Sequence, residues 1–294
     1  MPYTEPAPSD RREVQYRYHR GLFPALHDWE RTERAIVGFT GREGPEGLLG
    51  LDQMGHFGPQ GCDLVVEAVL ARAERTADLC ELGSGFGGAL RYAVDRLTAR
   101  GAPVRRALGI DLVPEHCAVA RDIDRAQGRT ASTFLCASAG AVPLADASLD
   151  LVLVTGSMPH FPAPGEVLRE AARVLRPGGL LAVTEEVSLT PGEGGPSEAF
   201  RVTHPRAVFC TTPLAERLRA LAGAGFVDVV RRDLTDWAVA LLADRLKVLR
   251  VFRGSVVGIY GAASTDLIRD TLAAARAEYV AGRLSPALIT ARRA

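Results

Sequence analysis

The sequence contains a single lysine, Lys247, so arginine supplies nearly all of its positive charge. Its 35 basic and 35 acidic residues balance, which argues against nucleic acid or an anionic membrane as a general partner. The planar guanidinium group of arginine can bind carboxylates and phosphates through two parallel hydrogen bonds. An anionic substrate would therefore meet a guanidinium group.

Cysteine is also scarce and irregularly spaced. The five cysteines are an odd number with no CxxC pair: Cys62, Cys80, Cys117, Cys136 and Cys210. This pattern indicates neither a disulfide framework nor a zinc site. We expect free thiols and no bound metal.

Long apolar runs are missing as well. Residues 1–20 are polar and charged and lack the apolar stretch of a signal peptide, and no run approaches the length of a membrane span. These absences favour a cytoplasmic protein. At 294 residues with 47% hydrophobic content, the chain is long enough for one large or two small well-packed domains.

What the sequence does contain, from residue 61 onward, is a regular alternation of strand and helix patterns. Strands are expected at residues 77–81, 106–111, 132–136, 149–155, 180–185, 226–231 and 287–290. Helices are expected at residues 62–75, at 87–100, from residue 114 onward and at 166–175. This alternation predicts an α/β fold with a doubly wound, mostly parallel seven-stranded sheet, whose ligands bind at the carboxyl ends of the strands.

Two regions fall outside that alternation. Residues 1–60 are expected to form an N-terminal helical arm and a lid, and residues 61–294 one ligand-binding domain. Within that domain, residues of about 234–283 are expected to insert two helices as a cap. The arm is long enough to pack on a second copy in a homo-oligomer.

A glycine-rich loop follows the first strand, in the segment Glu81-Leu82-Gly83-Ser84-Gly85-Phe86-Gly87-Gly88. Glycine allows backbone to approach a ligand closely, and the next helix offers unpaired N–H groups. Taken alone, the Gly83-x-Gly85-x-x-Gly88 spacing also fits a dinucleotide fingerprint. The loop therefore predicts a nucleotide-like cofactor without specifying which one.

Four features near the glycine-rich loop narrow the choice of cofactor. Glu81 precedes the glycines, Asp111 ends the second strand, Thr155-Gly156-Ser157 follows the fourth, and an Arg-Pro-Gly-Gly turn at residues 176–179 leads into the fifth. With these motifs in this order, residues 62–232 resemble the class I S-adenosylmethionine (SAM)-dependent methyltransferases. The resemblance implies a Rossmann-like methyltransferase fold and SAM as the cofactor.

The same resemblance implies which residues bind SAM. In this family the glycine loop lies under the methionine part, the acid after the second strand binds the ribose, and the segment after the third strand borders the adenine. Carried over, the cofactor-binding residues are Glu81, Gly83, Ser84, Gly85, Asp111, Leu112, Ser138, Ala139, Thr155 and, from the lid, Gln53. Many relatives have an aspartate where this chain has Ser138, so adenine contact there depends on a hydroxyl or on backbone.

The acceptor site is expected between the lid and the cap. The segment at residues 51–58 resembles the lid of small-molecule methyltransferases, among them sterol and prenyl-diphosphate C-methyltransferases. That likeness implies that Gln53, His56 and Phe57 fold over the cofactor. Trp237 and Tyr260 of the cap are candidates to line an apolar pocket for a small lipophilic acceptor.

Several residues are candidates to carry the chemistry. His160 and His56 are the best-placed general bases for an oxygen or nitrogen acceptor. For an alkene acceptor, Glu185 or Glu186 would remove a proton from the cation that forms. At most one of these two faces the cleft, because neighbouring strand residues point opposite ways.

An arginine- and histidine-containing segment follows the fifth strand. Arg201, His204 and Arg206 would bind the diphosphate of a prenyl substrate. The lid and the paired carboxylates favour C-methylation of a prenyl or other alkene-type metabolite, as in terpenoid secondary metabolism. O- or N-methylation of a natural product stays open. Two other classes of protein also stay open, an NAD-dependent reductase and a non-catalytic SAM-binding subunit. The sequence has no Tyr-x-x-x-Lys pair of the kind that a reductase would need.

Overall fold

The protein is described by a computed structural model that covers residues 8–41, 51–189 and 195–294. Its centre is one twisted sheet in the order β3-β2-β1-β4-β5-β8-β7, with β6 paired to β5 beside this path. The strands are β1 (Asp78–Leu82), β2 (Arg106–Asp111), β3 (Ser132–Cys136), β4 (Leu149–Thr155), β5 (Leu175–Ser188), β6 (Thr212–Pro213), β7 (Phe226–Asp233) and β8 (Leu284–Arg293). All pairs are parallel except those of β8 with β5 and β7. The doubly wound, mostly parallel α/β sheet predicted from the sequence is confirmed.

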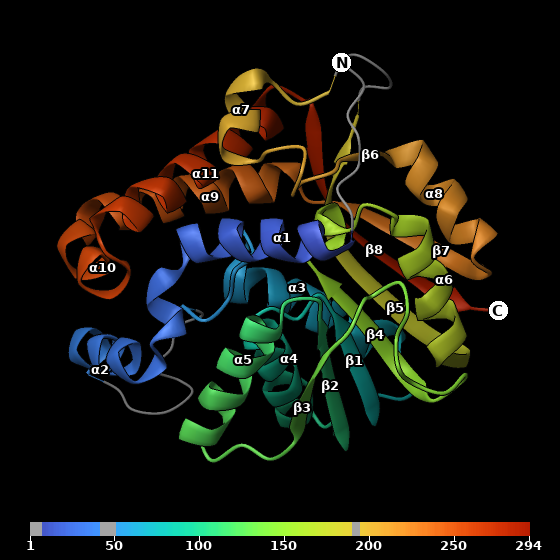
Figure 1. The fold of residues 1–294 in the computed structure, drawn as a ribbon. Helices are drawn as coiled ribbons and strands as arrows, with labels where there is room; N and C mark the ends of the chain where they lie inside the picture. The colour runs from blue at the N-terminus through green and yellow to red at the C-terminus, as the bar shows by residue number, and fades with distance from the viewer. Residues whose placement is uncertain (1–7, 42–50, 190–194) are drawn as a thin grey trace.

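Helices cover both faces of this sheet (Figure 1). Side chains alternate along each strand, so Leu79 packs with the helices of one face and Cys80 with those of the other. The first face carries α3 (Gly58–Arg72), α4 (Gly88–Ala99) and α5 (Pro114–Ala126). The second carries α6 (Pro164–Val174) and α8 (Leu214–Gly223).

The remaining helices form a layer over the carboxyl ends of the strands. They are α1 (Pro8–Leu22), η1 (Pro24–His27), α2 (Trp29–Thr40), α7 (Glu198–Thr203), α9 (Thr235–Val251), α10 (Arg253–Tyr260) and α11 (Ala262–Val280). One further short helix, η3 (Met158–His160), follows β4. In Figure 1, α1 crosses the molecule below the orange helices α9 and α11. The cap thus contains three helices where two were expected, because Phe252 and Gly261 interrupt the helical run. None of the described helices is long and apolar enough to cross a membrane.

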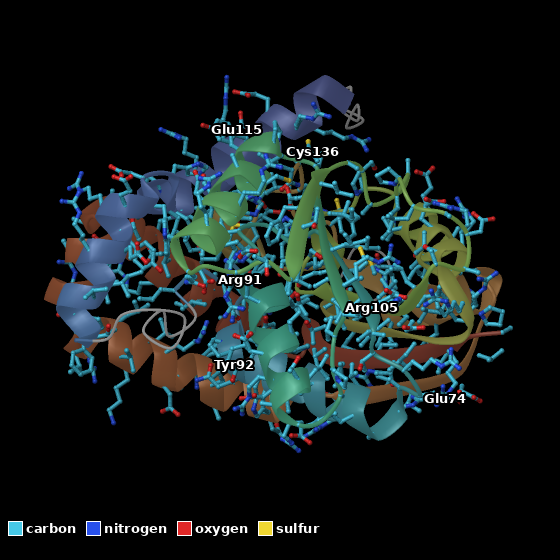
Figure 2. All side chains as sticks on the ribbon, turned by 90° about the horizontal axis from the view of Figure 1, so that it is seen from below. Glu74, Arg91, Tyr92, Arg105, Glu115 and Cys136 are labelled. Carbon is cyan, nitrogen blue, oxygen red and sulfur yellow. The ribbon has the colours of Figure 1, made fainter. Side chains whose placement is uncertain are left out.

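The lid segment, residues 51–58, is tied to the α/β core by a buried arginine. Arg91 of α4 pairs with Asp52 of the lid at 2.9 Å and with Asp124 of α5 at 3.0 Å. Figure 2 shows Arg91 in the interior, whereas Glu74 lies at the periphery. A buried charge is tolerated when it is paired in this way. The ion pairs therefore fix the lid over the glycine loop.

Candidate functional site

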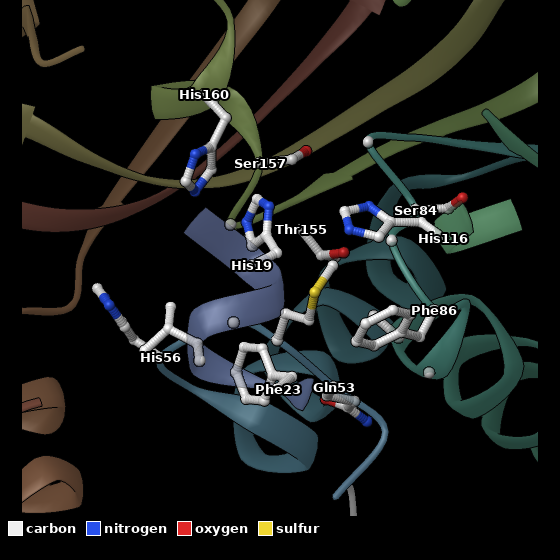
Figure 3. Close-up of a pocket in the computed structure, with 18 of the residues that line it drawn as sticks. His19, Phe23, Gln53, His56, Ser84, Phe86, His116, Thr155, Ser157 and His160 are labelled. Carbon is white, nitrogen blue, oxygen red and sulfur yellow. The ribbon is translucent and has the colours of Figure 1, made fainter. Parts of the chain in front are cut away.

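A large cavity lies between the carboxyl ends of the central strands and the layer of lid, arm and cap. Its volume is about 1300 Å³. The walls come from the glycine loop, the ends of β2, β4 and β5, the lid, α1 and the cap helices α9–α11. In Figure 3, His56 and His116 lie on opposite sides of the cavity and His19 lies between them.

The glycine loop is held in place by the end of β2. Gly83 and Gly85 have φ angles of 73° and 52°, which favour glycine over residues with a side chain. The Gly85 N–H donates to Asp111 Oδ2 at 2.8 Å. Asp111 Oδ1 accepts from the Val113 N–H at 2.9 Å and contacts His116 Nδ1 at 3.1 Å. Asp111 therefore fixes the loop while its carboxylate borders the cavity.

Two buried oxygen atoms near the loop, Glu81 Oε2 and Ser84 Oγ, have no hydrogen-bond partner within the described residues. Thr155 donates its hydroxyl to the other oxygen of Glu81. Buried polar atoms normally have partners, so these two are suited to contact a polar ligand. Together with the loop and Asp111, they fit the methionine and ribose parts of SAM.

The other expected cofactor residues also lie at the cavity wall. Leu112, Ser138, Ala139 and Gln53 line it. The Ser138 hydroxyl accepts from the Gly140 N–H at 3.2 Å, so its own proton is available to a ligand. These residues form the end of the site where the resemblance places the adenine, with Gln53 on the lid side.

At the end of β5, Glu186 faces the cavity and binds two side chains. It is buried, and its Oε1 contacts His56 Nδ1 at 2.9 Å and accepts from the Tyr279 hydroxyl at 2.9 Å. Burial alone raises the pKa of Glu186, but the hydrogen bonds from His56 and Tyr279 outweigh it and lower that pKa below its ordinary value. Glu186 is thus ionised and orients the His56 ring.

His204 and His160 complete this part of the wall. The Nε2 atoms of His56 and His204 are 3.3 Å apart, so one proton lies between the two rings. Burial, and next the charge of His56, lowers the pKa of His204 to about 2. Burial lowers the pKa of His160 to about 4, and its Nδ1 has no partner within the described residues. Both rings are therefore neutral near neutral pH.

Glu185 does not line the cavity. Its carboxylate accepts from Arg217 Nε at 2.8 Å and from Nη2 at 2.9 Å, and both side chains are almost fully buried. Because strand residues alternate in direction, Glu185 points to the opposite face from Glu186. The structure thus corrects its candidacy as a catalytic base and gives it a structural ion pair.

Arg201 and Trp237 also lie away from the cavity. The Arg201 guanidinium donates to the carbonyl oxygens of Phe209, at 2.7 Å, and of His204, at 3.3 Å. Trp237 packs edge-on against Phe57 with ring centroids 5.4 Å apart. Both expectations of substrate contact are corrected, because backbone carbonyls and core packing already engage these side chains.

The other residues expected at the acceptor site do lie at the wall. Phe57, His204, Arg206 and Tyr260 line the cavity. Tyr260 donates its hydroxyl to the Leu51 carbonyl at 2.7 Å, which ties the cap to the lid. Within the described residues, no group of three or more His, Cys, Asp or Glu side chains is arranged to hold a metal.

One wall of the cavity, which α1 provides, was not predicted from the sequence. Gln15, Tyr18, His19 and Leu22 line the cavity, and Gln15 Oε1 has no partner within the described residues. Their spacing of i, i+3, i+4 and i+7 marks one helix face and was the available signal. His116, five residues after Asp111, was missed as well.

Comparisons with known proteins agree with this architecture. Residues 80–183 match the family model described as a methyltransferase domain. The chain is 36% identical over 110 residues to the methyltransferase GfsG of Streptomyces halstedii, covering 36% of this chain and 37% of the relative. It is 35% identical over 123 residues to the 27-O-demethylrifamycin SV methyltransferase of Amycolatopsis mediterranei, covering 40% and 44%. The chain thus spans less than half the length of these two relatives.

A solved structure shows how far the fold is shared. The geranyl diphosphate C-methyltransferase of Streptomyces coelicolor A3(2) superposes with a TM-score of 0.61 at 18% identity, covering 79% of this chain and 76% of the other. Identity this low speaks for the fold alone. The sheet order, the glycine loop and the matched family model together show that the chain carries a class I, SAM-dependent methyltransferase domain, which confirms the resemblance drawn from the sequence.

Proposed function

We propose that the protein transfers the methyl group of SAM to an oxygen or nitrogen atom of a small, largely apolar metabolite. The observation that carries this proposal is His56, held by the buried, ionised Glu186 at the cavity wall. A base oriented in this way takes the proton that a hydroxyl or amine must lose on methylation. SAM, when bound, supplies an electrophilic methyl group on its sulfonium.

The roles of the chain's own residues follow from their positions. The glycine loop and Asp111 would orient the cofactor, and Gln53, Phe57 and α1 would exclude water from the reacting atoms. The proton of the acceptor would pass to His56 Nε2 once the His204 ring gives up its 3.3 Å contact with that atom, and Glu186, on His56 Nδ1, would stabilise the resulting positive charge. His160, with its pKa of about 4, is neutral near neutral pH, and its unpartnered Nδ1 is suited to hydrogen-bond the acceptor.

The volume of the cavity supports a large acceptor molecule. At about 1300 Å³, it exceeds the roughly 300–1,000 Å³ typical of a site for one small molecule. It has room for a cofactor and a second molecule together. One relative is named for the acceptor 27-O-demethylrifamycin SV, which agrees with methylation of a large natural product on oxygen.

C-methylation of a prenyl diphosphate, which the lid and the paired carboxylates favoured, is the second candidate. Glu186 at the wall supports it, since a carboxylate there could remove a proton from a carbocation. Two features weaken it: Glu185 is engaged by Arg217, and Arg201 by backbone carbonyls. Only His204 and Arg206 of the expected diphosphate-binding cluster face the cavity.

Methyl transfer from radiolabelled SAM to a panel of phenols, macrocyclic alcohols, amines and prenyl diphosphates tests the proposal. We expect labelled product with a hydroxyl or amine acceptor and none with prenyl diphosphates. Product from prenyl diphosphates alone would contradict base-assisted methylation and favour the second candidate. The acceptor methyl ether, which has no proton to lose, is the matched control and should give no product.

A further inference from the structure

Gln15 of α1 presents an unpartnered oxygen to the cavity. Its side-chain nitrogen donates to the carbonyl oxygens of Val208, at 3.4 Å, and of His160, at 3.5 Å. Because carbonyls only accept hydrogen bonds, the NH₂ group faces them and Oε1 is left as an acceptor. Oε1 is buried and has no partner within the described residues. Gln15 therefore offers the cavity an acceptor and no donor.

Two histidines beside Gln15 have the same polarity. His19 Nδ1 donates to the Gln15 carbonyl at 2.9 Å. The His160 ring is hydrogen-bonded to the Val208 carbonyl, and its Nδ1 is buried without a partner in the part of the chain that the structure describes. Burial lowers the pKa of both rings, that of His160 to about 4, so each carries one proton near neutral pH. That proton faces a carbonyl, which leaves His19 Nε2 and His160 Nδ1 as bare acceptors.

These three acceptors lie together on one wall of the cavity. The rings of His19 and His160 have centroids 5.2 Å apart, and both point into the space that Figure 3 shows. Gln15 joins them, since its carbonyl holds His19 and its amide holds the backbone of His160. All three residues line the cavity. The wall thus gathers atoms that can only accept hydrogen bonds.

The hydroxyl groups near this wall do not supply the missing protons. Tyr18 packs against His160 with ring centroids 6.2 Å apart, but its hydroxyl donates to the Thr203 carbonyl at 3.1 Å. Ser157 donates to the Leu82 carbonyl at 2.6 Å. Buried acceptors without partners cost free energy. A ligand that donates hydrogen bonds would remove this cost.

One phenylalanine separates this wall from the proposed base. The Phe209 ring packs edge-on against His160, with centroids 5.5 Å apart, and stacks on His56, with centroids 6.4 Å apart. The group that His56 deprotonates and the group that faces α1 are therefore different parts of one acceptor molecule.

We propose that Gln15, His19 and His160 form a subsite for a second hydroxyl group of the acceptor, which is bound there but not methylated. The proposal rests on the proposed function and deepens it, because it makes the acceptor an apolar metabolite with at least two hydroxyls. A hydroxyl fits better than an ammonium group, because none of the three side chains is a carboxylate that would pair with a buried cation. Such a subsite rejects analogues without the hydroxyl, since they leave its buried atoms unpaired.

Calorimetric titration of the complex with S-adenosylhomocysteine tests the subsite. The probes are 2-naphthol, three dihydroxynaphthalenes that differ in the separation of their hydroxyls, and 2-naphthylmethylamine, which is a cation at neutral pH. The wild type is expected to bind at least one diol about 10- to 100-fold more tightly than 2-naphthol, as for hydrogen bonds to otherwise unpaired buried acceptors. His160→Phe and Gln15→Met should each reduce this ratio to about threefold or less.

A matched variant and a measurement on the wild type complete the test. His27→Phe changes a histidine whose ring packs against Phe86 behind the wall, and it should keep the ratio. Long-range proton–nitrogen NMR correlations, which need no variant to fold, should place the proton on Nε2 of His160 and on Nδ1 of His19.

Four results would overturn the subsite. They are no preference for any diol in the wild type, an undiminished preference in both variants, the opposite tautomers, and tighter binding of the amine than of every diol. Failure to methylate any hydroxyl or amine in the acceptor panel would instead contradict the proposed function.

Discussion

At the scale of single residues, two adjacent glutamates take opposite roles because they share a strand. Glu186 faces the cavity and holds His56, while Glu185 faces the other side and pairs with Arg217. Alternation along the strand requires this division but does not say which residue faces in. The sequence could therefore predict a carboxylate at the end of β5 without choosing between the two.

Glu186→Gln tests the catalytic role of the inward carboxylate. Without the negative charge, the His56–His204 pair loses the group that stabilises its added proton, so kcat should fall by about 10²-fold or more. The affinity for S-adenosylhomocysteine should stay within twofold of the wild type. Steady-state kinetics with the acceptor found in the panel measures this, and the exposed Glu198→Gln is the matched control. An unchanged kcat would rule out the His56–His204 pair as the base.

Arg217→Met tests the structural role of the outward carboxylate. The substitution leaves Glu185 buried without its partner, which should lower the free energy of unfolding by about 3–5 kcal/mol. Urea unfolding measures the change. The double variant Arg217→Met/Glu185→Leu, which removes both charges, should recover much of that loss. A single variant as stable as the wild type would show that the pair contributes little.

At the scale of elements, the lid is held by the cap at both of its ends. Tyr260 of α10 donates to the Leu51 carbonyl, and Arg245 of α9 donates to the His56 carbonyl. Between these points the lid presents Gln53 and His56 to the cavity. Cap and lid therefore act as one cover, although they lie some two hundred residues apart in the chain.

Tyr260→Phe should loosen this cover without unfolding the core. Loss of one hydrogen bond costs about 1 kcal/mol locally, so amide hydrogen exchange in residues 51–58 should become faster. Exchange in β1 and β4 should not change. Tyr16→Phe on α1, whose hydroxyl contacts Arg20 rather than the lid, is the control. Equal exchange rates in wild type and Tyr260→Phe would show that this contact does not hold the lid.

The sequence predicted best those helices and strands that are marked by a pattern of neighbouring residues in the chain. The central strands and the glycine loop have strong local signals, and the structure places them close to the expected ranges. β8 is longer than expected because it pairs antiparallel with β5 along its length, a contact that no local pattern reveals. The place of Arg245 at the site was missed for the same reason. The helical spacing of α1 is visible in the sequence, but the cavity that this helix lines forms only when distant segments pack together.

At the scale of the whole molecule, the amino ends of the strands are fixed by charge and the carboxyl ends carry the site. Asp78, at the start of β1, accepts from Arg105 at 2.9 Å, Arg106 at 3.2 Å and Arg176 at 3.0 Å. Asp150 of β4 joins the same cluster through Arg176 at 2.6 Å. The arginine of the Arg-Pro-Gly-Gly turn thus links two strands on the side away from the cavity.

This cluster predicts how stability depends on pH. Burial raises the pKa of Asp78, but the hydrogen bonds and charges of Arg176, Arg106 and Arg105 outweigh it and lower that pKa below its ordinary value. The stabilisation is therefore full above the unfolded-state pKa of about 4 and is lost as the pH falls through the lower folded-state pKa. Urea unfolding should find Asp78→Asn less stable by about 2 kcal/mol at pH 7, with the difference shrinking below pH of about 4. A difference that does not depend on pH would contradict this account.

The central claim is that the cavity above the glycine loop binds SAM, and calorimetric titration with S-adenosylhomocysteine and NAD tests it most directly. S-adenosylhomocysteine is expected to bind the wild type at one site with a Kd of about 1–100 μM, and NAD is expected not to bind. Asp111→Ala should weaken the binding of S-adenosylhomocysteine severely, because the carboxylate that we expect to bind the ribose also holds the Gly85 N–H. Binding of NAD in preference to S-adenosylhomocysteine, or of neither, would contradict the account.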